Sequence, residues 1–282
     1  MAVRAFGLTD PGRVRESNED QFLVAVLVKA LQVQWTSLPS PKMNHSHDRS
    51  HLFVVADGMG GQAAGETASA LAIDSVESFV LDSLKWFAHC EGDDQDRVLA
   101  ELKKSIRQAS LRVEAEGASR PELSGMGTTL TVAYTLNDEL FVAHAGDTRC
   151  YLLREQTLHR LTRDHTLIDE MLRHGQISPE QARHHHWRHV IVNALGGGCP
   201  EIDVELHKLR LHADDKLLLC SDGLTEMLSD EEIAHVLQEE NDPEQACREL
   251  VKIANHQGGQ DNITVVIAHF EADEAQAGEI VK

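Results

Sequence analysis

Short apolar runs recur along the chain, and turn-forming residues bound most of them. Such runs are typical of β-strands, which bury one or both faces against a core. They predict strands at residues 3–8, 21–28, 51–57, 128–136, 139–147, 149–155, 202–209, 215–222 and 263–270. The turns within 128–155 are only a few residues long, which is typical of antiparallel neighbours.

A second pattern repeats apolar side chains at the spacing of an amphipathic helix. It predicts long helices at 62–87 and 97–116, and shorter ones at 166–175, 230–240 and 243–256. Strands at both ends of the chain, with helices between and after them, indicate an α+β fold. In such a fold we expect the helices to pack outside antiparallel sheets.

Two stretches follow neither pattern. Residues 29–50 contain two prolines, several serines and little periodicity, so we expect a long exposed loop there. Residues 271–282 are expected to form a solvated acidic tail. No linker interrupts the chain before this tail, which favours a single domain over residues 1–270.

The net charge of the chain limits the classes of partner that we expect it to bind. Its 282 residues include 46 acidic and 26 basic side chains, for a formal charge of −20. This charge disfavours nucleic acid and anionic membranes as partners and suits a protein that collects cations. The five cysteines form no C-x-x-C pair, and the N-terminus lacks the long apolar segment of a signal peptide. We expect a cytoplasmic protein that does not span a membrane.

A glycine-rich stretch almost matches a nucleotide-binding loop. Residues 60–67 read GGQAAGET, which fits the spacing G-x-x-x-x-G-K-[ST] except at Glu66. The usual lysine at that position contacts the terminal phosphates, and a carboxylate would repel them. The glycine-rich turn therefore needs another explanation.

Four aspartates share one local context, because each lies in a small-residue turn at the end or start of an apolar run. They are Asp57, Asp147, Asp222 and Asp261. Any one of them can be an ordinary turn residue, since Asp-Gly is a common turn dipeptide. Together they indicate a site for Mg²⁺ or Mn²⁺, which bind oxygen ligands and relieve the repulsion among clustered carboxylates.

The segment RESNED, residues 15–20, adds a cation and two acids between the first two strands. The guanidinium of Arg15 suits a phosphoryl group, and Glu19 and Asp20 suit metal-coordinated water. Taken alone, the segment also fits a solvated surface turn.

In their order along the chain, these segments resemble the protein phosphatase 2C (PPM) family, and in particular its bacterial branch. The matching motifs are GRVRESNED, VVADGMGGQAAGE, SGMGTTLTVAY, AHAGDTRCYLLR, LTRDHT, LLLCSDGLTEML and GGQDNITVVI. The resemblance implies a central antiparallel β-sandwich flanked by helices on both sides, in four αββα layers. It also implies a binuclear Mn²⁺ or Mg²⁺ centre at one edge of the sandwich.

Four ligands of the centre follow from the resemblance. Asp57 matches the ligand that bridges the two ions, and Gly58 would bind through its carbonyl oxygen. Asp222 and Asp261 would complete the shell of the first ion. Gly58 to Gly65 would then form a sharp strand-to-helix turn beside metal ions, and Glu66 would face no phosphate.

The remaining site residues also follow from the family motifs. Glu19 and Asp20 would act on the second ion through water. Asp147 matches a ligand of a third, weaker ion beside Asp222, and Arg15 matches the phosphate-binding arginine.

The implied reaction is hydrolysis of phosphoserine or phosphothreonine in proteins by water activated between two ions, with Arg15, Asp57 and Asp222 as catalytic residues. The implied partners are phosphorylated proteins, substrates of a Ser/Thr protein kinase, and the expected state is a monomer. Two alternatives stay open: a catalytically weak regulatory module that binds phosphoproteins, and a phosphatase of small phosphate esters.

The chain departs from many relatives at Met59, where they carry a histidine that can protonate the leaving oxygen. His165 in TRDHT is a candidate substitute, although a structural role is favoured. Residues 166–195 match the family's flap, a segment beside the active site. Within the flap, His185 and His189 share helical spacing, which leaves a zinc site as a minority interpretation.

Overall fold

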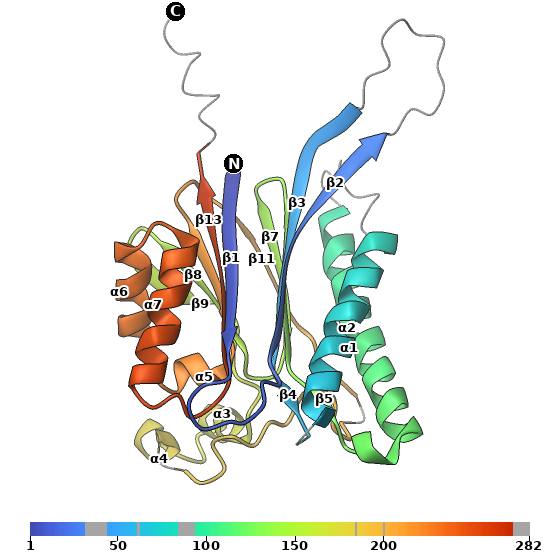
Figure 1. The fold of residues 1–282 in the computed structure, drawn as a ribbon, viewed down its shortest axis with the longest axis vertical. Coiled ribbons are helices and arrows are strands. Elements are labelled where there is room, and N and C mark those ends of the chain that lie inside the picture. Colours follow the sequence, from blue (N-terminus) through green and yellow to red (C-terminus); the bar gives the residue numbers. More distant parts are fainter. Residues whose placement is uncertain (32–43, 61–62, 84–93, 184, 200, 273–282) are drawn as a thin grey trace, which may run out of the picture.

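The structure is a computed structural model that describes residues 1–31, 44–60, 63–83, 94–183, 185–199 and 201–272. Two five-stranded sheets, antiparallel throughout, face each other in the middle of the molecule (Figure 1). In the first sheet the strand order is β1 (Ala2–Asp10), β13 (Ile263–Glu271), β12 (Lys216–Cys220), β8 (Arg149–Arg154) and β9 (Thr157–Arg160). In the second it is β11 (Glu205–Arg210), β7 (Glu139–Ala145), β6 (Leu130–Leu136), β3 (Asn44–Ala56) and β2 (Gln21–Leu31).

Helices cover both outer faces of the sandwich (Figure 1). Helices α1 (Ala63–Ser83) and α2 (Asp94–Ser119) pack on the second sheet, and α6 (Asp230–Glu239) and α7 (Pro243–His256) pack on the first. Apolar side chains of the two sheets form a separate core between them, among them Phe53, Val142, Leu217 and Val266. The α+β fold and its four layers are therefore confirmed.

Shorter elements lie at one end of the sandwich. They include a three-stranded sheet with the order β10 (Leu195–Gly196), β5 (Gly127–Thr128) and β4 (Gly58–Met59). The short helices are α3 (Leu167–Arg173), α4 (Pro179–Arg183), α5 (Asp222–Thr225) and the 3₁₀ turn η2 (Pro121–Leu123). Among the described residues, no helix combines the length and apolar character needed to cross a membrane.

The expected loop at 29–50 is wrong at both of its ends. β2 continues to Leu31 and β3 begins at Asn44, and the two strands pair there as a hairpin with Ala30 opposite His45. This pairing uses main-chain hydrogen bonds, which any residue except proline can make, so it needs no apolar alternation. The remaining residues 32–43 and the tail from 273 lie outside the described residues. The short strand β9 was not predicted.

Candidate metal centre

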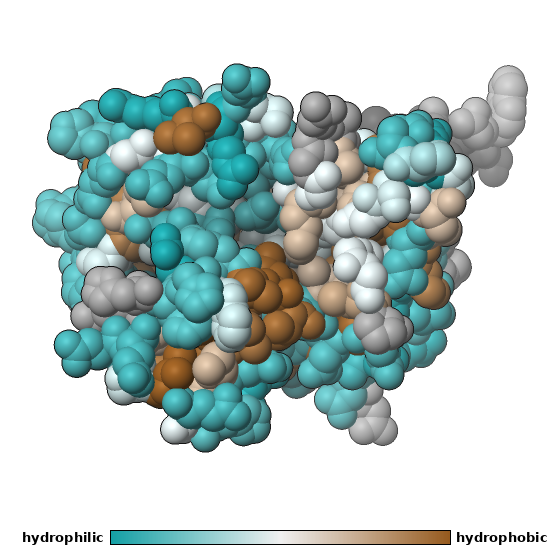
Figure 2. Space-filling model, turned by 90° about the horizontal axis from the view of Figure 1, so that it is seen from below, coloured by the Kyte–Doolittle hydropathy of each residue, from teal (hydrophilic) through white to brown (hydrophobic). Residues whose placement is uncertain are grey.

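The four aspartates come together at one end of the sandwich. Asp57 follows β3, Asp147 follows β7, Asp222 follows β12, and Asp261 precedes β13. All four line one hollow of about 740 Å³, together with Arg15, Glu19, Gly58 and Met59. Figure 2 looks onto this end of the molecule, where a mostly hydrophilic surface surrounds an apolar patch. The convergence predicted from the four turns is therefore found.

The main chain of Asp57 is held by a neighbouring turn. Its N–H donates to Oγ1 of Thr129 at 3.0 Å, and its carbonyl accepts from the N–H of Thr129 at 2.9 Å and from Oγ1 of Thr128 at 2.8 Å. The GTT segment of the sequence thus fixes the position of this aspartate. From the sequence, the supporting role of the GTT segment could be inferred only through the family resemblance.

Gly58 is required by close packing rather than by flexibility. A Cβ at this position would collide with the carbonyl oxygens of Gly65 and Glu19. The glycine-rich turn therefore brings the start of α1 directly against the segment that carries Glu19. Glu19 lines the hollow beside Gly58 and Asp57.

Asp20 lies behind the hollow rather than in its lining. Its side chain is buried, and Oδ2 accepts a hydrogen bond from Oγ of Ser221 at 2.6 Å. Burial is the main cause that raises its pKa to about 8, and the charges of Asp222 and Asp261 add to it. Asp20 thus lies next to the site and is not among the residues that line the hollow.

The clustered carboxylates repel one another and leave buried oxygens without partners. Oδ1 of Asp147 and Oδ1 of Asp222 are buried and lack hydrogen-bond partners. Burial, followed by repulsion from Asp20 and Asp222, raises the pKa of Asp57 well above its usual range. Burial and repulsion from Glu226 and Asp261 raise the pKa of Asp222 to about 7. Divalent cations would remove this repulsion and satisfy the unpaired oxygens, so the residues present fit a metal centre.

Arg15 reaches the hollow from the loop after β1. Its Nη2 lies 2.7 Å from Oδ2 of Asp261, and its side chain is 57% exposed. The guanidinium is therefore accessible from solvent at the edge of the carboxylate cluster, where a phosphoryl group would meet both.

His189 and Glu226 also line the hollow, and the sequence did not assign either to the centre. Nδ1 of His189 lies 2.7 Å from Oε1 of Glu226, and both side chains lie near Asp222. Asp222 is the first residue of α5 and Glu226 directly follows its last, a separation of four residues that could have indicated a shared face. His189 lies 33 residues before Asp222 in the chain, and only the fold brings it here.

His185 and His186 are not among the residues that line the hollow. The rings of His185 and His186 stack with centroids 4.8 Å apart, and the ring of Trp187 is tilted against both at 4.7–5.4 Å. Among the described residues, His185 is not part of any group of three potential metal ligands, whereas His189 is. The part of the chain that the structure describes therefore gives no support to a zinc site that pairs His185 with His189.

Comparisons with known proteins agree with this geometry. The profile of the family described as protein phosphatase 2C matches residues 42–265. The serine/threonine protein phosphatase PstP of Mycobacterium tuberculosis is 39% identical over 269 residues, which cover 95% of this chain and 45% of PstP. The chain thus spans about half the length of that relative. The serine/threonine phosphatase stp of Listeria monocytogenes is 33% identical and is matched over 96% of both chains.

Solved structures extend the likeness to three dimensions. A crystal structure of the M. tuberculosis phosphatase PstP/Ppp superposes with a TM-score of 0.77 at 33% identity, covering 96% of this chain and all of that one. A structure of the PstP catalytic domain in complex with two manganese ions has a TM-score of 0.74 at 33% identity, covering 96% of this chain and 99% of that one. The chain belongs to the protein phosphatase 2C family.

Proposed function

We propose that this protein is a metal-dependent phosphatase that hydrolyses phosphoserine and phosphothreonine in proteins. The observation that carries the proposal is the meeting of four strand-end aspartates and Arg15 in one hollow. Two buried carboxylate oxygens in that hollow lack partners, and bound cations would satisfy both. The names of the relatives and the two manganese ions of the PstP structure support the same function.

The ion-binding residues would be those that surround the hollow. Asp57 is central and would be shared, Gly58 would offer its carbonyl oxygen, and Asp222 and Asp261 would bind from the other side. Asp147 would hold a third, weaker ion with the free Oδ1 that faces no partner. When bound, Mn²⁺ or Mg²⁺ would neutralise phosphoryl oxygens and lower the pKa of water.

The residues around these ligands have distinct tasks. Glu19 and the buried Asp20 would keep water ordered at one side of the centre. Arg15 would exchange its contact with Asp261 for the phosphoryl oxygens and hold the phosphorus in line for attack. Most of the rate enhancement in phosphoryl transfer arises from such positioning and charge stabilisation.

The leaving oxygen receives no proton from Met59, whose thioether has none to give. Met59 lines the hollow at the position after Gly58. The alkoxide of serine or threonine is strongly basic, so its protonation falls to water in the site. This makes the protein slower on alkyl phosphates than a relative with a histidine there would be.

The proposal includes the partners and setting of the protein. Its substrates would be phosphoproteins made by a Ser/Thr protein kinase, and it would act as a monomer in the cytoplasm. A reducing compartment fits the four described cysteines, which are all free thiols. Residues 1–270 would form one domain, with 166–195 as the flap beside the site.

A regulatory module without turnover is disfavoured because every expected carboxylate except the buried Asp20 lines the hollow. The test is phosphate release from a phosphothreonine peptide and from p-nitrophenyl phosphate at increasing Mn²⁺. We expect both substrates to be hydrolysed, EDTA to stop the reaction, and added Mn²⁺ to restore it. Activity that persists in EDTA would refute the metal mechanism, and hydrolysis of the aryl ester alone would favour small phosphate esters.

A further inference from the structure

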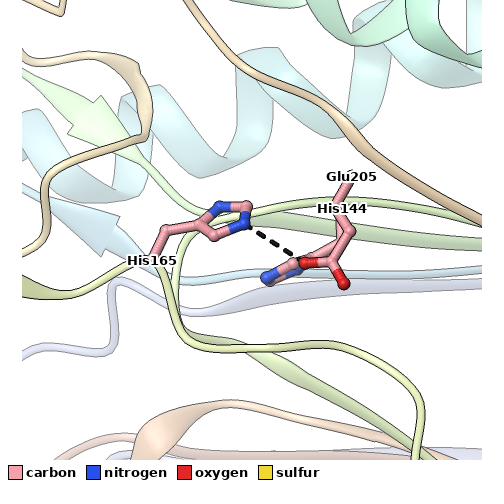
Figure 3. Close-up of side chains that lie close together, drawn as sticks. All are labelled: His144, His165 and Glu205. Atoms are coloured by element: carbon pink, nitrogen blue, oxygen red, sulfur yellow. Dashed lines mark hydrogen bonds and ion pairs between the residues drawn. The ribbon is translucent and has the colours of Figure 1, made fainter. Parts of the chain in front are cut away.

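A second cluster of potential ligands lies next to the hollow. His144 from β7, His165 from the loop before α3, and Glu205 from β11 bring their polar atoms within 4.8 Å of one another (Figure 3). The two rings lie with their centroids 4.8 Å apart, and both histidines are buried. The question is whether this group binds a metal ion or does something else.

The hydrogen bonds of His165 fix its tautomer. The N–H of Gly146 lies 3.1 Å from Nδ1, and since a backbone N–H can only donate, Nδ1 must carry a lone pair. The proton of the neutral ring is therefore on Nε2, which lies 3.2 Å from Oε2 of Glu205. Figure 3 shows this contact as the dashed line. Neither nitrogen keeps a lone pair free for a metal ion.

Hydrogen bonds fix the tautomer of His144 as well. Its Nε2 lies 3.0 Å from the carbonyl oxygen of Gly146 and 2.9 Å from that of Arg163, so this nitrogen must be the donor. Its Nδ1 accepts from Oγ1 of Thr131 at 2.8 Å. Burial, followed by the charge of His165, lowers the pKa of His144 to about 3, which keeps the ring neutral. The cluster is a hydrogen-bonded support and not a metal site.

One end of this support is Gly146, the residue directly before Asp147. Its carbonyl accepts from the N–H of His165 at 2.7 Å and from His144, and its N–H donates to His165. Gly146 has a φ of +118°, and a Cβ there would collide with Thr129. The two histidines therefore hold the main chain from which the Asp147 carboxylate enters the hollow.

The other end is the return segment of the flap. Nδ2 of Asn193 donates to Nδ1 of His165 at 2.7 Å, so Gly146 and Asn193 share one acceptor. The carbonyl of His165 accepts from the N–H of Val192 at 2.9 Å. Ile191, which directly precedes Val192, lines the hollow with His189. A single imidazole thus contacts both the Asp147 turn and the flap.

Glu205 keeps the imidazole in this orientation. Its Oε2 accepts from His165, and its Oε1 lies 2.7 Å from Nε2 of His207. Burial raises the pKa of Glu205, but the hydrogen bonds from His165 and His207 outweigh it, and the pKa lies below its ordinary value. The carboxylate therefore stays charged and accepts the Nε2 proton of His165, so that Nδ1 remains the acceptor.

We propose that His165 is a positioning residue, through whose Nδ1 the Asp147 turn and the flap are held as one unit beside the hollow. The acceptor at Nδ1 then sets both the affinity of the Asp147 site for Mn²⁺ and the rigidity of residues 189–193. The first of these consequences rests on the proposed function. Supports of this kind behind a ligand typically change metal affinity by about 10- to 100-fold when removed.

Two variants separate the acceptor from the bulk of the ring. In His165→Asn, the amide oxygen lies near the position of Nδ1 and can still accept from Gly146 and Asn193. In His165→Gln, the amide reaches toward Glu205 and leaves the N–H of Gly146 without its acceptor. Both are probed by hydrogen exchange of the 166–195 amides and by calorimetric titration with Mn²⁺.

We expect His165→Gln to weaken the weakest Mn²⁺ site by about tenfold and to speed exchange at Val192 and its neighbours. His165→Asn should stay within about twofold of the parent in both measurements. Equal changes in the two variants would overturn the proposal, because they would show that the ring merely fills space.

A second variant, Asn193→Ala, leaves the Asp147 turn intact and removes the bond of Asn193 to His165 together with its two bonds to the main chain of Asp203. It should speed exchange in the flap while Mn²⁺ affinity stays within about twofold. If His165→Gln fails to fold, faster exchange in Asn193→Ala but not in His165→Asn still supports the proposal, and unchanged exchange in Asn193→Ala overturns it. Neither readout needs turnover, so a parent protein without phosphatase activity would refute the proposed function separately.

Discussion

Nη2 of Arg15 lies 2.7 Å from Oδ2 of Asp261, so the proposed phosphate-binding group forms an ion pair with a proposed metal ligand. The contact with Asp261, together with the charges of Glu19 and Asp222, raises the pKa of Arg15, and the guanidinium remains fully charged. When substrate binds, the phosphoryl group would therefore replace the Asp261 carboxylate as the anion that contacts Arg15.

Replacing Arg15 should affect the substrate and spare the ions. We expect Arg15→Ala to lower kcat/KM for a phosphothreonine peptide by roughly 10- to 100-fold, the loss typical of a charge-assisted hydrogen bond. Mn²⁺ affinity measured by calorimetry should not fall, because a cation is not a ligand. Arg15→Lys serves as the control that keeps the charge but not the two-pronged geometry. A weakened Mn²⁺ affinity in Arg15→Ala would contradict this assignment.

Removing the Asp147 carboxylate should change the metal requirement of the reaction. Its Oδ1 is buried without a partner, and a third ion would bind there. We expect Asp147→Ala to raise the Mn²⁺ concentration for half-maximal activity by about tenfold, while two ions still bind tightly. Identical Mn²⁺ titrations of the variant and the parent would show that Asp147 is only a turn residue.

Met59→His tests the absence of a proton donor beside Gly58. An aryl leaving group needs little protonation, whereas the alkoxide of threonine needs much. The variant should therefore accelerate phosphothreonine peptide hydrolysis more than p-nitrophenyl phosphate hydrolysis. It should add an ionisation near pH ~6.5 to the peptide profile only. If a crystal structure shows the imidazole facing the hollow and both rates change equally, leaving-group protonation is not limiting.

His144 gives a prediction about stability and pH. Its pKa falls from 6.5 to about 3 on folding, so between these values the unfolded chain binds a proton that the folded chain does not. The free energy of unfolding is therefore unaffected by this group above pH 6.5 and decreases as the pH falls below it. The parent should lose about 1.4 kcal/mol relative to His144→Gln between pH 7.5 and 5.5. Denaturant unfolding at both pH values measures this difference, and a constant difference would contradict it.

Much of the carboxylate cluster could be predicted from the sequence because its signals are local. Asp57, Asp147 and Asp222 each follow an apolar strand, and strand ends of one sandwich meet at common edges. The helices on both faces could be predicted equally well, because the spacing of their apolar residues indicates which side is buried.

The residues that the sequence did not reveal depend on contacts between distant segments. Glu205 lies on an ordinary strand, and its partner His165 is 40 residues away in the chain. His189 meets Glu226 only because the fold brings together segments that are 37 residues apart in the chain. The hairpin extension of β2 and β3 has no apolar signal either, because main-chain pairing alone forms it.

Anomalous diffraction from crystals soaked in Mn²⁺ tests the metal centre most directly. We expect two strong peaks in the hollow lined by Asp57, Asp222 and Asp261, and a weaker one near Asp147. No peak is expected between His144 and Glu205, because the nitrogen lone pairs there are already used. The absence of Mn²⁺ from the hollow, or its presence at the histidine cluster instead, would contradict the proposed centre and its mechanism.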